Sequence, residues 1–380
     1  MPRHQLSSEK ILIIFWLSTH GEHLMKTDQF QPQTYRLLGG PGSPYSLKMR
    51  ALLRYRRLPH LWIVPSGYLG SEGELKLAGK GMIPVLQYPD GSYHADSTPL
   101  IFELEKRHPG YRSVLPDDPA ASFLSHLIED MADELLVEAM FDMRWGAEFD
   151  RTFCATRQLQ GWLGVIARPK LDALVAKFTS RQTSKREAMS TTEEGYQLLA
   201  SFYIATLTVL ESMLERTAYL FGGRPSLADF GLYAQLCQCA LDPSASTIMR
   251  SCAPRTFQWT QSLDDASGVD GDWVPQSTWD PSVREMLALA GRFYLPLLRA
   301  HHHAVESRTE SFEVVIDDLV WRGQAESYKH KCLVWLQREW AALAPEDKAK
   351  VQPMLQETGC LDYLTIVLTG NKPVPDMSPR

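Results

Sequence analysis

The feature that most constrains the fold is a glycine-rich break between a short apolar run and a helical segment. Residues 35–38 read Tyr-Arg-Leu-Leu, residues 39–41 read Gly-Gly-Pro, and a helical pattern follows over 44–57 with Ser43 and Pro44 at its start. This order predicts a strand, a tight turn and a helix with Ser and Pro in its first turn. The free backbone N–H groups and the positive end of the helix dipole point out of such a turn. The segment therefore predicts an anion-binding site.

Length and composition narrow the class of protein. With 380 residues, the chain is long enough for two domains and an extension. Apolar residues make up 44% and charged residues 22%, which is typical of a soluble globular protein. The net charge of −6 does not favour a nucleic-acid surface. We expect a cytoplasmic protein without a nucleic-acid or membrane partner.

The cysteine and histidine patterns do not favour a metal site. The six cysteines are scattered through helix-like segments, which fits reduced cytosolic thiols better than a disulfide framework. Cys237 and Cys239 form a Cys-x-Cys pair, but no second Cys/His pair lies at zinc-like spacing. Residues 301–303 are three consecutive histidines, which on a helix point in different directions and cannot converge on one ion. We expect no metal.

An apolar run near the N-terminus is the one candidate targeting segment. Residues 10–18 are far fewer than the roughly 20 apolar residues that a bilayer-spanning helix needs. No A-x-A-like cleavage site follows the run, although a cleaved signal peptide remains the alternative. We interpret residues 1–33 as an N-terminal extension, with Met25 as an alternative start.

From residue 61 onward the pattern alternates short strands and helices. Pro84 interrupts an apolar run, which is acceptable at a strand start, and a cis Ile83–Pro84 bond would turn the Ile83 backbone outward. Asp90-Gly91 is a strong turn signal. The pattern predicts strands over 61–64, 82–88 and 92–95, and helices over 71–78 and 96–108.

Four motifs in residues 35–108 together resemble the thioredoxin-fold N-terminal domain of the glutathione transferase superfamily. In chain order they are Ser43-Pro44-Tyr45-Ser46, Ile83-Pro84-Val85-Leu86, the Asp90-Gly91 turn and Asp96-Ser97. Each motif is weak alone, but the four at this spacing are fairly specific. The resemblance implies an α/β thioredoxin-like, glutathione-binding domain over 34–112.

The remainder of the chain is helical in pattern, which supports the resemblance. Ser226 and Asp229 form a capping box that is similar to the one in the helical domain of glutathione transferases, where its role is folding. We expect an all-α domain over 118–262 and an α-rich extension with a short β-hairpin over 263–380, similar to bacterial glutathione-transferase-like proteins with a long C-terminal extension. The predicted helices span 120–150, 154–178, 192–216, 226–241, 281–306, 324–343 and 345–358, and the hairpin spans 312–321.

Serine at positions 43 and 46 decides between two kinds of reaction. Thioredoxin-fold reductases and cysteine-type transferases carry Cys at position 43, and its thiolate attacks disulfides. With hydroxyls at both positions, no mixed disulfide forms here, and activation of bound glutathione is favoured. A charge-assisted hydrogen bond of about 1.5–3 kcal/mol, with about 0.3–1 kcal/mol from the helix N-terminus, makes thiolate the main species. We predict that Ser43 donates this bond, with a helix cap as its alternative role.

The resemblance implies the remaining glutathione contacts. The main chain of Ile83, positioned by Pro84, is expected to bind the cysteinyl backbone. Asp96 and Ser97 are expected to hold the γ-glutamyl end, because a carboxylate pairs with its ammonium and a hydroxyl with its carboxylate. The alternative is that the pair simply caps a helix. We expect the Tyr45 ring to pack beside the thiol, with a catalytic hydroxyl as the alternative.

Several other charged residues are given expected roles outside the main glutathione contacts. We interpret Lys48 and Arg50 as surface charges, and we consider Lys80 or Arg57 for the glycyl carboxylate. The remaining expectations are a solvated acidic helix face formed by Glu129, Asp130, Asp133 and Glu134, and an approach of Arg144 and Trp145 to a second-substrate pocket.

The leading hypothesis is a glutathione transferase that uses glutathione as co-substrate. It would add the thiolate to an electrophilic, apolar substrate, as in detoxification, and the resemblance implies a homodimer. One alternative is a non-catalytic binding or scaffold protein of the same family. The other is a glutathione-dependent isomerase or ether-cleaving lyase on the same fold.

Overall fold

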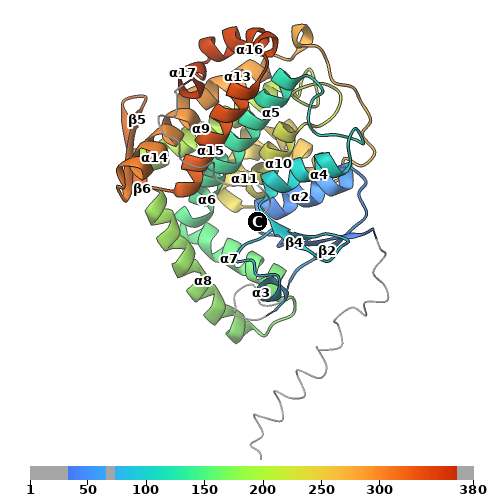
Figure 1. Cartoon of the computed structure of the whole chain (residues 1–380). Helices are drawn as coiled ribbons and strands as arrows, with labels where there is room; N and C mark the ends of the chain where they lie inside the picture. Colours follow the sequence, from blue (N-terminus) through green and yellow to red (C-terminus); the bar gives the residue numbers. More distant parts are fainter. Residues whose placement is uncertain (1–32, 66–72, 366–380) are drawn as a thin grey trace, which may run out of the picture.

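The computed structural model describes residues 33–65 and 73–365 (Figure 1). The apolar run at 10–18, Met25 and nearly all of the predicted N-terminal extension lie outside the described residues. So do residues 71 and 72 of the helix predicted over 71–78.

A four-stranded sheet with flanking helices forms the N-terminal domain. The strands β1 (Tyr35–Leu38), β2 (His60–Ile63), β3 (Val85–Gln87) and β4 (Tyr93–Ala95) lie in the order β2-β1-β3-β4. Strands β1 and β2 are parallel, and the other two pairs are antiparallel. The helices are α2 (Pro44–Tyr55), α3 (Glu74–Leu77) and α4 (Ser97–Arg107). This mixed sheet confirms the predicted thioredoxin-like domain.

Alternation along the strands divides the side chains between two cores. Successive residues of a strand point to opposite faces of the sheet. Leu37 and its partner Leu86 join the main core with helices α2 and α4. Leu38 and its partner Val85 pack on the opposite face against Leu75 of α3.

The chain after the sheet domain is mostly helical, as predicted. Its first part contains α5 (Pro119–Met131), a π-helical turn η3 (Ala132–Leu136), α6 (Val137–Gly146), α7 (Glu148–Leu163), α8 (Arg168–Met189), α9 (Glu193–Met213), α10 (Leu227–Cys239), α11 (Pro243–Cys252) and α12 (Pro254–Leu263). The capping box predicted for α10 is present: the Asp229 carboxylate accepts the Ser226 backbone N–H at 2.8 Å.

One helix prediction in this part is wrong. The pattern indicated a continuous helix over 154–178, but α7 and α8 are separate. Gly164 ends α7 with a φ of 62°, a conformation that glycine adopts without strain. Pro169 lies in the first turn of α8, where its missing N–H costs nothing.

The C-terminal part wraps over both preceding parts. It contains a 3₁₀ turn η4 (Gln276–Thr278), α13 (Ser282–Leu289), a π-helical turn η5 (Ala290–Tyr294), α14 (Leu295–Ser307), the hairpin strands β5 (Ser311–Ile316) and β6 (Leu319–Gln324), α15 (Ser327–Ala342), α16 (Pro345–Glu357) and α17 (Leu361–Leu364). Helix α15 runs beside α5 (Figure 1). The Trp335 ring packs against Phe102 of α4, and Trp340 packs against Phe123 of α5.

The acidic loop after α12 contacts the basic face of α2. Arg50 and Arg54 both pair with the Asp264 carboxylate, at 2.6 and 2.7 Å. Arg50 is therefore a contact between domains and not only a surface charge.

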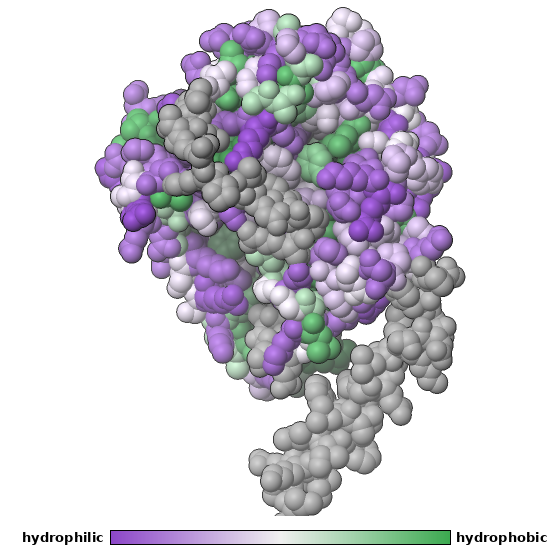
Figure 2. All heavy atoms as spheres, in the orientation of Figure 1, coloured by the Kyte–Doolittle hydropathy of each residue, from purple (hydrophilic) through white to green (hydrophobic). Residues whose placement is uncertain are grey.

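Two whole-molecule features complete the description. No helix within the described ranges has both the length and the apolar character needed to cross a bilayer, and all six cysteines carry free thiols. On the face shown in Figure 2, hydrophobic residues form separate patches among hydrophilic ones.

Candidate functional site

A cleft of about 240 Å³ lies where the N-terminal domain meets η3 and the start of α15. Its size is just below the ~300–1,000 Å³ typical of drug-sized ligands, so it fits one end of a tripeptide. The residues that line it are Tyr45, Met82, Ile83, Pro84, Asp96, Ser97, Thr98, Asp133, Glu134, Glu326 and Tyr328.

Five of the six predicted site residues line this cleft. They are Tyr45, Ile83, Pro84, Asp96 and Ser97, and the Ile83–Pro84 peptide bond is cis, the geometry considered for it above. Ser43 is the exception, since it does not belong to the lining. Their contacts with glutathione stay predictions.

Ser43 caps helix α2. It has an extended backbone, with a φ of −99°, and its Oγ accepts a hydrogen bond from the Ser46 N–H at 3.3 Å. A hydroxyl also has a proton to donate, so this cap leaves the Ser43 O–H available for a thiolate. The capping role and the predicted thiol contact are compatible.

The Tyr45 hydroxyl donates to the backbone carbonyl of Asp133 at 2.8 Å. Burial raises the pKa of this phenol well above its usual value, and Glu134 and Asp133 add to the effect. The hydroxyl proton is thus already engaged, and the geometry favours the packing role for the ring over a catalytic hydroxyl.

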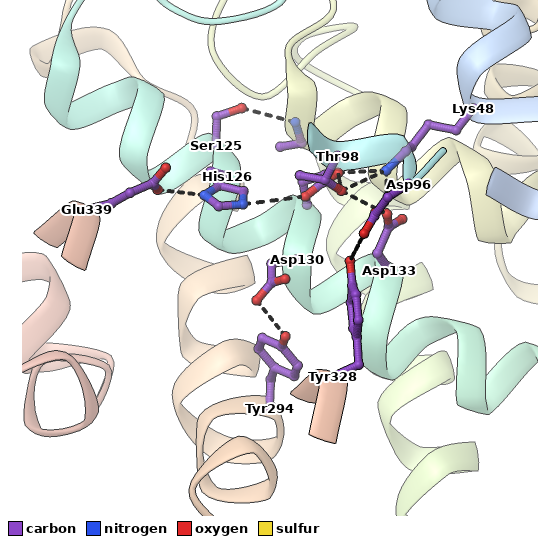
Figure 3. Close-up of polar contacts among 12 residues, drawn as sticks. Lys48, Asp96, Thr98, Ser125, His126, Asp130, Asp133, Tyr294, Tyr328 and Glu339 are labelled. Carbon is purple, nitrogen blue, oxygen red and sulfur yellow. Dashed lines mark hydrogen bonds and ion pairs between the residues drawn. The ribbon is translucent and has the colours of Figure 1, made fainter. Parts of the chain in front are cut away.

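Asp96 does not cap helix α4. Its φ of 81° lies in the region that favours glycine, and its side chain makes no cap hydrogen bond. Such a conformation costs about 1–3 kcal/mol. Instead, the Tyr328 hydroxyl donates to both carboxylate oxygens of Asp96, at 3.0 Å each (Figure 3). The alternative prediction of a simple N-cap is therefore wrong for Asp96.

The structure corrects the prediction for Lys48. This residue is fully buried and not a surface charge. Its Nζ pairs with Glu129 at 2.6 Å and with Asp133, and it lies 3.4 Å from Thr98 Oγ1 (Figure 3). Burial alone would lower the pKa of Lys48, but the two carboxylates outweigh it and raise the pKa. Lys48 therefore ties α2 to α4 and α5.

The prediction of a solvated acidic face is also wrong. Glu129 and Asp130 lie in α5 and Asp133 in η3, and all three side chains are buried. Burial raises the pKa of Asp130 to about 6, and the Tyr294 hydroxyl bonds this carboxylate at 2.6 Å. Burial also raises the pKa of Asp133 and of Glu134.

His126 lies between these buried acids and a partly exposed glutamate. His126 Nδ1 lies 2.6 Å from the partly exposed Glu339 carboxylate, and its Nε2 faces Glu129 at 4.0 Å (Figure 3). Burial alone would lower the pKa of His126, but Glu339, with Glu129 and Asp130, raises it to about 9. His126 is therefore a buried imidazolium between carboxylates at neutral pH.

Sequence reasoning missed the part of the lining that lies outside the N-terminal domain. Asp133 and Glu134 sit in the π-helical turn η3, a feature that recurs at functional sites. No signal in the sequence indicated their burial, because the acids at 129, 130, 133 and 134 fall together on the side of the helix opposite the apolar positions, as they would on a solvated face. Glu326 and Tyr328 had no local signal either.

Four other predicted residues lie outside the lining. Arg144 is buried, and it bonds Asp242 at 2.5 Å and the Gly42 carbonyl at 3.2 Å, so it fixes the turn before Ser43. Trp145 packs against Phe178 in a separate core. These two residues are therefore not part of the described cleft. The candidates for the glycyl carboxylate do not line it either: they are Lys80, and Arg57, which donates to the Ser267 carbonyl.

The histidine run lies at the base of the hairpin. His301 is buried, and its Nδ1 accepts from the Glu326 N–H at 3.0 Å. His302 stacks on His330. No group of three or more potential metal ligands occurs among the described residues.

Comparisons with known proteins found a family-model match and similar solved structures. The family model described as glutathione S-transferase, N-terminal domain, matches residues 37–112. Similar solved structures include a glutathione S-transferase from Methylobacterium radiotolerans in complex with glutathione sulfonate, with 19% identity over 64% of this chain and 97% of that chain and a TM-score of 0.38. Another is the beta-etherase LigF from a Sphingobium strain, with 18% identity over 67% of this chain and 98% of that chain and a TM-score of 0.44.

No curated protein sequence matches the chain. The match to residues 37–112 covers nearly all of the residues that form the four-stranded sheet and its helices. Residues 37–112 are therefore similar to the N-terminal domain of glutathione S-transferases.

Proposed function

We propose that the protein binds glutathione in the described cleft and is a glutathione transferase in which Ser43 stabilises the thiolate. One observation carries the proposal. The domain that matches the glutathione S-transferase family model brings Ile83, cis-Pro84, Asp96 and Ser97 to a single cleft, with Tyr45 from the first turn of α2 beside them.

The chemistry follows from the start of helix α2. The Ser43 hydroxyl donates to the bound sulfur while its oxygen keeps the cap bond to the Ser46 N–H. This bond and the helix dipole lower the pKa of the thiol from about 8.5, and the released proton passes to solvent. The sulfur electron pair then forms a bond to an electrophilic carbon, and a leaving group departs with the electrons of the broken bond.

A second candidate, a non-catalytic binding protein of the same family, is favoured by the charge of the lining. Asp96, Asp133, Glu134 and Glu326 line the cleft, and no lysine or arginine of the described residues does. Glutathione carries two carboxylates, so this lining suits only its ammonium end. The homodimer implied by the resemblance also stays a prediction, which sedimentation analysis would test.

Calorimetric titration with glutathione tests the binding site. The parent protein is expected to bind, and Asp96→Ala to bind about 10-fold or more weakly. An exposed serine on α8, Ser184, provides the control variant Ser184→Ala, which should bind as the parent does. Absence of binding by the parent would refute the proposal.

The absorbance of the glutathione thiolate tests catalysis separately. In the parent, the pKa of the bound thiol should be below about 8.5, and in Ser43→Ala it should return toward that value. Binding with an unshifted thiol pKa in the parent would favour the non-catalytic candidate. A panel of apolar electrophiles would then identify the second substrate of an active protein.

A further inference from the structure

The C-terminal part of the chain supplies two residues of the cleft. Glu326 immediately precedes α15, and Tyr328 lies in the first turn of that helix. The Tyr328 hydroxyl reaches across to Asp96, from which it is 232 positions distant in the chain (Figure 3). The end of the cleft at Asp96 is therefore built from both the N-terminal domain and the C-terminal part of the chain.

Neighbouring contacts hold this first turn of α15 in place. Lys329 is buried, and its Nζ lies 2.8 Å from Glu138, 3.3 Å from Glu326 and 3.8 Å from Glu134. The Glu326 N–H donates to His301 at 3.0 Å. Glu326 and Tyr328 therefore belong to a fixed wall.

The groups that face this end of the cleft are hydrogen-bond acceptors, and one acceptor oxygen has no partner among the described residues. Asp133 is only 4% exposed, it lines the cleft, and its Oδ1 has no hydrogen-bond partner among the described residues. Asp96 presents a second carboxylate at this end of the cleft, where it accepts from the Tyr328 hydroxyl. The Tyr328 hydroxyl donates to Asp96, and its own lone pairs remain acceptors.

Two nearby cations already pair with acids, and three of these acids also line the cleft: Asp133, Glu134 and Glu326. Lys48 pairs with Glu129 and Asp133, and Lys329 pairs with the three glutamates named above. Neither lysine lines the cleft. A ligand that presents a primary ammonium, with three N–H donors and a positive charge, matches this wall in both hydrogen bonding and charge.

The geometry points to Tyr328 and Glu326 as binding residues that, with Asp96, form a pocket for the α-ammonium group of the γ-glutamyl end of the ligand. This inference rests on the proposed function, and it gives the C-terminal part a direct role in ligand selection. Tyr328 orients the Asp96 carboxylate and accepts from the ammonium, and Glu326 adds a second negative charge. The pocket selects ligands that carry the amine over ligands that lack it.

A matched pair of ligands tests the inference. The probes are glutathione and its desamino analogue, in which hydrogen replaces the α-amino group, titrated by calorimetry into the full-length protein. The parent should bind glutathione roughly 10- to 100-fold more tightly than the analogue. In Tyr328→Phe and in Glu326→Gln this preference should fall to about threefold or less, while affinity for the analogue changes little.

Two control variants come from the same part of the chain. Tyr363→Phe and Glu346→Gln remove the same chemical groups outside the lining, and both should keep the parental preference. Thermal unfolding of each variant shows whether it is folded. Tyr328→Phe keeps the ring and its packing, so its effect reports on the hydroxyl.

The outcomes separate the two proposals. If the parent binds glutathione but Tyr328→Phe and Glu326→Gln keep the full preference for the amine, the inference is overturned and the proposed function stands. Tighter glutathione binding by Tyr328→Phe would also overturn the inference, because the hydroxyl would then compete with the ligand for Asp96. If the parent binds neither probe, the proposed function fails, and the inference fails with it.

Discussion

The two helix starts of the N-terminal domain use their polar side chains in opposite ways. At α2, Ser43 has an ordinary extended backbone and bonds the Ser46 N–H in its own helix turn. At α4, Asp96 has a positive φ, makes no cap, and bonds Tyr328 from the far end of the chain. The Ser43 side chain bonds within its own helix. The Asp96 backbone is strained, and its carboxylate lines the cleft. A Ser or Asp before a helix therefore does not by itself reveal a cap.

Removing Lys48, which connects α2 to the helices beside α4, should have the largest effect on the free energy of unfolding. Lys48→Ala leaves Glu129 and Asp133 buried without their cation, so we expect a loss of about 3–5 kcal/mol in the free energy of unfolding, measured in urea. The exposed Lys76 offers a control, since Lys76→Ala should change stability by less than about 0.5 kcal/mol. A similar small change for Lys48→Ala would show that the two helix starts are not coupled.

Removing the charge at the α4 start should affect binding rather than stability. Asn tolerates a positive φ better than most residues, so Asp96→Asn keeps the backbone and removes the charge. We expect glutathione affinity to fall by about 1.5–3 kcal/mol, roughly 10- to 150-fold, with little change in the unfolding midpoint. A large loss of stability with unchanged affinity would assign Asp96 to folding alone.

The pH dependence of stability should report on the charged groups behind α4. The pKa of His126 is raised from 6.5 to about 9 in the folded protein. Because the folded state holds this proton more tightly, the contribution is complete below about pH 6.5 and is lost as the pH rises through about 9. We expect a decrease of about 1–3 kcal/mol across that range, by urea unfolding at several pH values.

A variant separates this effect from other titrations. His126→Gln should flatten the decrease between pH 6.5 and 9, because it removes the titrating group between Glu339 and Glu129. An unchanged pH profile in the variant would show that another group is responsible.

The smallest effect on stability is expected at the α2 start. Ser43→Ala removes one cap and should cost about 0.5–2 kcal/mol of unfolding free energy, whereas Ser43→Thr should restore most of it. Chemical denaturation of the three proteins measures both. No loss in Ser43→Ala would mean that the cap contributes nothing, and would remove the contrast with Asp96.

The sheet domain was predictable because its signals are local. The Gly-Gly-Pro break, the Asp90-Gly91 turn and the Pro after Ile83 each restrict the backbone within a few residues, and their order along the chain resembles a known thioredoxin-like domain. The break between α7 and α8 was missed because Gly164 lies inside a segment that was assigned to one helix.

The far wall of the cleft was not predictable from local patterns. Lys48 and Asp133 look like ordinary surface charges in their own segments, and only their juxtaposition across two domains makes them a buried pair. Tyr328 likewise has no sequence neighbour that points to Asp96. Such contacts depend on how distant elements pack, and no helical or strand period encodes that information.

The contact between Tyr328 and Asp96 also has a consequence for biosynthesis. A chain emerging from the ribosome presents its N-terminal domain first, and domains generally fold in that order. The ribosome adds 232 further residues after Asp96 to reach Tyr328, the hydrogen-bond partner of Asp96. The sheet domain can form early, but this end of the cleft closes only when α15 has docked. We therefore expect chains that end before α15 to bind the ligand more weakly than the full chain. Such truncated chains should retain the sheet but lose this end of the cleft.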